Sequence, residues 1–222
     1  MTMTTQSNAE TGALRVHARS SSGEIEALVR FAHEVLPALP ASYVERRMRE
    51  FPIVWTASRG ADLVAFQLVD VHVTSGVRLV HVGPLFSKEG AWVAIFEAML
   101  HTELSREQPF CLGVEVESKE TERKLRRLLP TTTRPGPSGY VPVDERVLAR
   151  WFAKSFERIE GLDEDSLTVR VSNPMYPNAA AETRSIVLVP CIEEEDREVI
   201  RLELARSVAS FQRHRGRSPR VA

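Results

Sequence analysis

The chain has 222 residues, of which 43% are hydrophobic and 27% charged, with a formal net charge of -1. These values are those of an ordinary globular protein, and a chain without net positive charge offers no global attraction to nucleic acid. No stretch approaches the roughly 20 consecutive apolar residues of a membrane span, and the two cysteines, Cys111 and Cys191, are too few for a disulfide framework or a zinc motif.

The first half of the chain is predicted to alternate between strands and helices. Residues 1–12 are a polar segment without the pattern of a secretory signal, and we expect a flexible leader and a cytoplasmic protein. A strand at 14–18 precedes helices at 25–36 and 42–51, the first of which repeats its apolar residues at helical spacing. Residues 53–86 predict three strands, with turns at Arg59-Gly60 and Ser75-Gly76.

The next elements are a helix at about 90–105, a strand at 110–117 and a charged helix at 118–129 that Pro130 ends. A linker rich in Pro, Gly, Ser and Thr occupies 130–142. Beyond it we predict a helix at 144–161 with Gly161 as its C-cap, and strands at 167–172 and 185–191. The apolar residues of 193–211 fit a helix or a strand, and the acidic residues at the start of this segment favour a helix. Residues 212–222 predict a basic disordered tail. The fold class is therefore α/β (α+β).

The order of these elements resembles the GNAT family of N-acetyltransferases. The stretches "VRLVHVGPLFSKEGAWVAIFEAMLHTEL" and "FCLGVEVESKETERKLRRLL" are similar to the family's fourth strand and its helix, and to the strand and helix that follow. The resemblance implies a GNAT-like, mostly antiparallel sheet flanked by helices over residues 13–135. It leaves residues 136–211 as a C-terminal extension, which we expect to pack on that domain.

The same resemblance implies an acyl-CoA site at the loop 87–91. In the family this loop carries a Q/R-x-x-G-x-G/A motif, whose backbone amides and helix N-terminus bind the pyrophosphate. The motif is degraded here, because Trp92 replaces the second small residue if Gly90 is the first glycine, and Glu89 replaces the first glycine if Ala91 is the second. If the resemblance extends to binding, we expect acetyl-CoA or another acyl-CoA to lie against Val82, Gly83, Leu85, Ser87, Lys88, Gly90 and Ala91. The alternative is a tight strand-to-helix turn that binds nothing.

Two groups of residues are candidates for acid–base chemistry. Glu115 and Glu117 alternate with valines and therefore point to one face of their strand, although a strand end fraying into solvent would show the same pattern. A two-residue turn at Ser75-Gly76 would place Asp70 opposite His81 on the face that also carries His72. This second group could orient a base or ligate a metal, or could be only a solvated or hydrogen-bonded sheet surface. No metal is assigned to it, and the family's usual tyrosine acid has no counterpart in "RRLLP".

The predicted function is acyl-CoA-dependent N-acyltransfer to an amine by direct attack on the thioester. Glu115, Glu117, His81 and Asp70 are the catalytic candidates. The alternative, favoured by the degraded motif, is a non-catalytic GNAT-like protein that binds or assembles with a partner. We expect no membrane or nucleic-acid partner, and the sequence leaves a protein partner or a homodimer open.

Overall fold

The computed structural model describes residues 5–6, 14–20, 25–88, 90–116, 119–136, 141–156, 160–170 and 183–215. These residues form two compact units, one comprising the described residues up to Gln108 and the other those from Pro109 onward. The division falls between Gln108 and Pro109. Within the described residues, no helix combines the length and the apolar character needed to cross a membrane.

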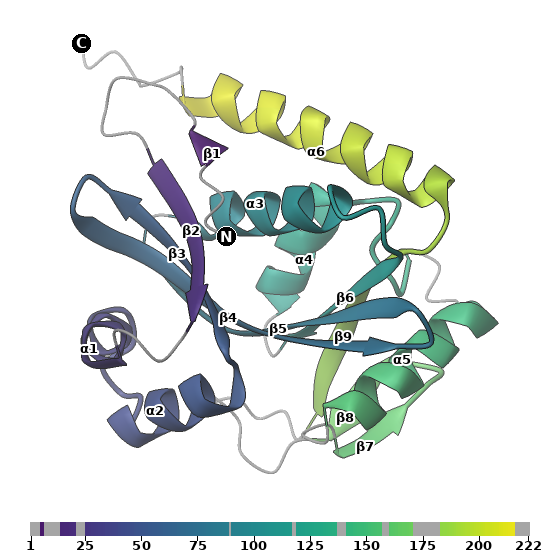
Figure 1. The fold of residues 1–222 in the computed structure, drawn as a ribbon, viewed down its shortest axis with the longest axis horizontal. Coiled ribbons are helices and arrows are strands. Elements are labelled where there is room, and N and C mark those ends of the chain that lie inside the picture. The colour runs from purple at the N-terminus through teal and green to yellow at the C-terminus, as the bar shows by residue number, and fades with distance from the viewer. Residues whose placement is uncertain are drawn as a thin grey trace. The chain divides into compact units, whose positions relative to one another are not determined.

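The first unit is an antiparallel meander with three helices (Figure 1). Its strands are β1 (Thr5–Gln6), β2 (Leu14–Ser20), β3 (Ile53–Arg59), β4 (Asp62–Thr74) and β5 (Val77–Ser87), and each pairs with the next. Helices α1 (Ile25–Val35) and α2 (Ala41–Glu50) connect β2 to β3, and α3 (Trp92–Leu104) follows β5.

The turn between β4 and β5 sets the register of the candidate residues. Ser75 and Gly76 have φ angles of 48° and 79°, and two consecutive positive values are those of the tight hairpin turn that matches strand twist. The turn pairs Thr74 with Val77 and, further along, Asp70 with His81. The predicted register of this hairpin is confirmed.

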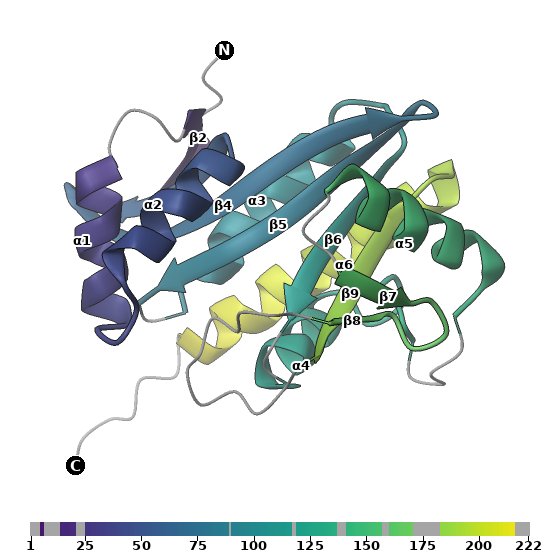
Figure 2. The same cartoon turned by 90° about the horizontal axis from the view of Figure 1, so that it is seen from below.

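The two faces of the meander carry different helices. One face packs its apolar residues against α1 and α2, in a cluster that includes Leu28, Phe31, Met48, Phe51, Phe66 and Phe86. Helix α3 contacts β2, β3, β4 and β5, and both views place it on the face opposite α1 and α2 (Figures 1 and 2). The meander is thus the middle layer of this unit.

The second unit contains the remaining elements of the chain. They are β6 (Phe110–Val116), α4 (Lys119–Leu128), α5 (Val143–Ser155), β7 (Glu160–Asp163), β8 (Thr168–Arg170), β9 (Thr183–Cys191) and α6 (Glu194–Arg215). Strands β6, β9, β8 and β7 pair in that order, and the pairings are antiparallel. Figure 2 shows α5 on one side of β6 and β9, with α4 and α6 on the other.

The predicted extension is joined to the strand at 110–117 by backbone hydrogen bonds. Strand β9 runs beside β6 from Phe110, paired with Cys191, to Val116, paired with Ser185. Helix α6 adds a side-chain link, because Glu203 accepts hydrogen bonds from the amide of Thr131 at 2.6 Å and the hydroxyl of Thr132 at 3.0 Å. The α/β (α+β) class, with an antiparallel sheet flanked by helices and a packed extension, is confirmed.

Several local predictions need correction. Thr5–Gln6, inside the expected flexible leader, forms β1 beside β2. Helix α5 ends at Ser155, and Gly161 lies in β7 with a φ of 62°, so Gly161 is not a C-cap. Helix α6 continues to Arg215, into the segment expected to be disordered, and residues 216–222 lie outside the described residues.

Candidate functional site

The junction between β5 and α3 is closed by its own hydrogen bonds. The Ser87 hydroxyl accepts the Trp92 amide at 3.1 Å and donates to the Lys88 carbonyl at 3.2 Å. The Ala91 amide donates to the same carbonyl at 3.1 Å, and the Lys88 amide donates to the carbonyl of Val64 at 2.9 Å. The Ser87 hydroxyl therefore satisfies the first amide of α3, which has no acceptor within the helix.

Gly90 is the part of this loop that remains open. It has a φ of 71°, and a Cβ built on it would meet nothing within 4 Å. Among the described residues, no acceptor receives its amide hydrogen. Glycine adopts this left-handed conformation without steric cost. One exposed backbone donor therefore stands at the start of α3, and Glu89, the neighbouring candidate for a repelling charge, lies outside the described residues.

Lys88, the cation expected to contact a phosphate, is turned toward α1. Its Nζ lies 2.6 Å from Glu34 Oε2 and 5.0 Å from the centre of the Phe31 ring. The hydrogen bond from Lys88 lowers the pKa of the Glu34 carboxyl. Both side chains are exposed, so the ion pair is weak and a stronger anion could displace it.

The expected cofactor residues on β5 are partly occupied by the protein itself. Val82 is buried, Leu85 is half-buried, and Gly83 lies against the Phe51 ring, which fills the space of a side chain. The Gly83 carbonyl accepts a hydrogen bond from Gln67 Nε2, close to the shift in the β4–β5 register between Gln67 and Val69. Sequence reasoning missed Gln67, although a glutamine inside an apolar strand was a visible signal.

Asp70, His72 and His81 occupy one face of the hairpin, as predicted. His72 Nε2 lies 3.7 Å from Asp70 Oδ2, and Asp70 Oδ1 accepts the Val71 amide at 2.8 Å. His81 is 1% exposed, and its ring centre lies 5.0 Å from that of Phe51. His72 is half exposed, so the pair offers solvent an imidazole beside a carboxylate, which is an arrangement suited to proton transfer.

Glu115 is held by a buried arginine in the second unit. Arg184 Nη1 donates to Glu115 Oε2 at 2.7 Å, and the side chains are 7% and 13% exposed. The Glu115 carboxylate is therefore already engaged in a buried, charge-assisted hydrogen bond. Arg184 was not among the predicted residues, because cross-strand pairing with β9 could not be read from the sequence. Glu117 lies outside the described residues.

The two cysteines do not present a reactive thiolate. Cys111 and Cys191 are free and buried. Burial raises the pKa of the Cys191 thiol to about 11 and also raises the pKa of Cys111, so both are protonated near neutral pH. No group of three or more His, Cys, Asp or Glu able to hold a metal occurs in the described ranges.

Comparison with known proteins gives matches only among solved structures. No protein-family model matches the chain, and no curated protein does. The chain is similar to the ribosomal-protein-S18-alanine N-acetyltransferase of Escherichia coli at 12% identity and a TM-score of 0.44, covering 80% of this chain and 95% of that one. It is similar to Arabidopsis thaliana Naa50 in complex with a bisubstrate analogue at 12% identity and a TM-score of 0.42, covering 78% and 97%.

A third match is a GCN5-related N-acetyltransferase from Kribbella flavida. It is 16% identical with a TM-score of 0.38, and the match covers 54% of this chain and 34% of that one. Two of these three solved structures are named as N-acetyltransferases.

Proposed function

We propose that the chain is an acyl-CoA-dependent N-acyltransferase. The observation that carries the proposal is the β5–α3 junction, where the exposed amide of Gly90 stands at the N-terminus of a 13-residue helix. A helix N-terminus with an unused donor favours a phosphate oxygen. The acyl-CoA would extend from Gly90 and Ala91 past Ser87 and Lys88 toward Gly83.

The reaction is direct transfer. A base removes a proton from the acceptor amine, whose nitrogen attacks the thioester carbonyl carbon. The carbon–sulfur bond then breaks, and the thiolate takes up a proton as coenzyme A leaves. Asp70, with His72 and His81 beside it, is the better candidate base, because the Glu115 carboxylate already binds the buried Arg184 guanidinium.

Titration calorimetry with coenzyme A tests the binding step. We expect heat at millimolar ligand, and we expect Gly90→Val to abolish it by blocking approach to the backbone. Glu89→Gly should strengthen binding severalfold, since it removes a like charge and restores a glycine. The matched control is Gly60→Val, because Gly60 also has a positive φ, of 64°, and open space around it. Absence of heat and of any thermal shift would contradict the proposal.

A second candidate, a non-catalytic binding or assembly protein, is favoured by a specific observation. The loop satisfies the amides of Lys88, Ala91 and Trp92 internally, and Lys88 is paired with Glu34. Apart from Gly90, the described part of this loop has its backbone donors satisfied without a ligand. Acyl transfer to a panel of amines distinguishes the two candidates: turnover that Asp70→Asn abolishes excludes the non-catalytic candidate, and identical results for the parent and the Gly90 and Glu89 variants favour it.

A further inference from the structure

A cavity of about 350 Å³ lies between α3 and the face of the meander that α3 covers. Its walls come from β2, β3, β4, β5 and the end of α3, all within the first unit. The volume is at the lower end of the range for small-molecule sites. The proposed acyl-CoA loop lies at the start of α3, whereas the cavity is lined by Met99, Thr102 and Glu103 from the second half of that helix.

The body of the cavity is apolar. Alternate residues of four neighbouring strands point to one face of a sheet, and here they supply a hydrocarbon surface that Met99 of α3 completes. The main apolar lining residues are Val16, Trp55, Val69, Val71, Val80 and Met99. Ala18 is exposed and also lines the cavity. A ligand with an apolar body would bury its surface here.

Three ionisable side chains line one end of the cavity. Arg78 Nε lies 2.6 Å from Glu103 Oε2, and Arg106 Nε lies 3.5 Å from Glu103 Oε1. Glu103 is 5% exposed, whereas Arg78 and Arg106 are 18% and 47% exposed. Two guanidinium groups against one carboxylate leave a charge of +1. No other ionisable residue lines the cavity within the described part of the chain.

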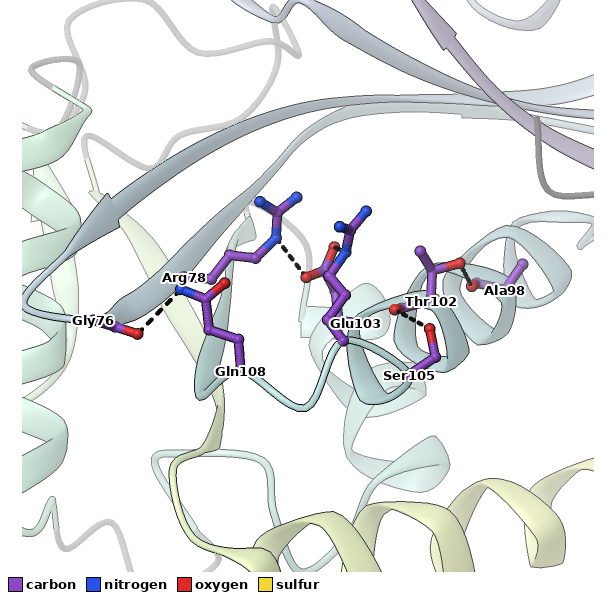
Figure 3. A network of polar contacts seen from close by, with 8 residues as sticks. Gly76, Arg78, Ala98, Thr102, Glu103, Ser105 and Gln108 are labelled. Carbon is purple, nitrogen blue, oxygen red and sulfur yellow. Dashed lines mark hydrogen bonds and ion pairs between the residues drawn. The ribbon is translucent and has the colours of Figure 1, made fainter. Parts of the chain in front are cut away.

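The terminal amines of both arginines remain available. Glu103 engages each guanidinium through Nε, and no acceptor among the described residues binds an Nη atom of Arg78 or Arg106. Figure 3 shows the terminal amines of Arg78 pointing away from Glu103. A guanidinium has five donors, so each arginine keeps a pair of amines whose spacing suits a carboxylate.

The hydroxyls at this end do not compete for an anion. Thr102 Oγ1 donates to the Ala98 carbonyl at 2.9 Å, and Ser105 Oγ donates to the Thr102 carbonyl at 2.8 Å (Figure 3). With their hydrogens used inside the helix, these hydroxyls can only accept further hydrogen bonds. Recognition of a negative group therefore falls to the arginines.

We propose that this cavity binds an apolar monocarboxylate. The hydrocarbon body would lie on the valine-rich face, and the carboxylate would bind the terminal amines of Arg78 and Arg106 and neutralise the charge of +1. Glu103 positions both guanidinium groups for this contact. The ligand class follows from the combination of an apolar wall with one uncompensated positive charge.

Fluorescence titration with decanoate tests the proposal on the full chain. Trp55 lines the cavity, so decanoate should change its emission saturably, and Trp55→Phe should remove that change. Arg106→Gln should weaken decanoate binding by about tenfold or more, because a charge-assisted hydrogen bond is lost. Arg106 is preferred to Arg78 because its half-exposed side chain can be replaced without leaving Glu103 unpaired.

Matched probes separate charge from shape. Decanol should bind the parent and Arg106→Gln equally, and decyltrimethylammonium should bind more weakly than decanoate. Arg15→Gln removes an exposed arginine of β2 that does not line the cavity, and should leave decanoate binding unchanged. Ala18→Phe should weaken both decanoate and decanol by filling the mouth.

Three results would overturn the proposal. The first is no saturable decanoate binding to the folded parent, and the second is an equal effect of Arg106→Gln and Arg15→Gln. The third is self-association of the chain, seen by sedimentation and abolished by Ala18→Phe, which would assign the cavity to a second copy instead.

Discussion

Arg184 and Glu115 form a buried ion pair, so neither charge has access to much solvent. Both groups are almost fully buried, so removing one leaves the other without its charge partner in a poor solvent for ions. We predict that Arg184→Met lowers the free energy of unfolding by about 3–5 kcal/mol, measured by urea denaturation.

Two variants control this prediction. Adding Glu115→Gln to Arg184→Met should restore part of the loss, because the uncompensated carboxylate is gone. Arg150→Met, which removes an exposed partner of Glu164, should cause no measurable loss. Equal losses for Arg184→Met and Arg150→Met would show that burial does not determine the strength of these pairs.

The backbone φ of Gly113 suits any residue, so its glycine is explained by packing and not by backbone conformation. A Cβ at this position would collide with the ring of Phe152, which is fully buried. We predict that Gly113→Ala lowers the free energy of unfolding by about 1–3 kcal/mol through overpacking. In the background of Phe152→Leu the same substitution should cost less, because space is released. Additive losses in this double-mutant cycle would contradict the steric explanation.

Among the helices, α3 carries the partly buried carboxyl of Glu97. Burial raises the pKa of Glu97 from 4.5 to about 7. Between pH 4.5 and about 7 the folded state binds more protons at Glu97 than the unfolded state does. The contribution of Glu97 to stability therefore falls as the pH rises through this interval and is constant above it.

We therefore predict that Glu97→Gln stabilises the protein at pH 8 by about 1 kcal/mol, a value reduced for the partial exposure of this side chain. At pH 4.5 the same substitution should have almost no effect. Urea denaturation at both pH values measures the difference, with Glu195→Gln, an exposed residue of α6, as control. A gain that is the same at both pH values would indicate a cause other than ionisation.

For the whole molecule, the C-terminal extension depends on residues before it. Strand β9 pairs with β6, and α6 binds through Glu203 to Thr131 and Thr132 and through Ser207 to the Leu128 carbonyl. We predict that residues 136–222 expressed alone are poorly folded or aggregate, because β9 loses its partner and α6 its anchors. Circular dichroism and urea denaturation measure this.

A fragment that begins at Pro109 retains β6 and α4, and should be more structured than the one that begins at 136. A cooperative unfolding transition from residues 136–222 would refute the prediction. Equal behaviour of the two fragments would show that β6 contributes nothing to the folding of the extension.

The sequence by itself determined the elements whose signals are local. Apolar periodicity predicted α1 and α3, and acidic residues at the start of α6 favoured a helix there over a strand. The Ser75-Gly76 turn predicted the register that pairs Asp70 with His81. The resemblance to acetyltransferases was likewise visible in the strand, loop and helix at 77–104. These signals depend on neighbours along the chain and on the intrinsic φ preferences of turn residues.

The tertiary structure alone decided which groups are already engaged. Arg184 binds Glu115 across 69 residues of sequence. Glu34 of α1 forms an ion pair with Lys88, and the Phe51 ring fills the space beside Gly83. The cavity beneath α3 likewise combines residues of four strands that only sheet pairing brings together. Contacts between distant segments depend on packing, and packing leaves no periodic trace in the sequence.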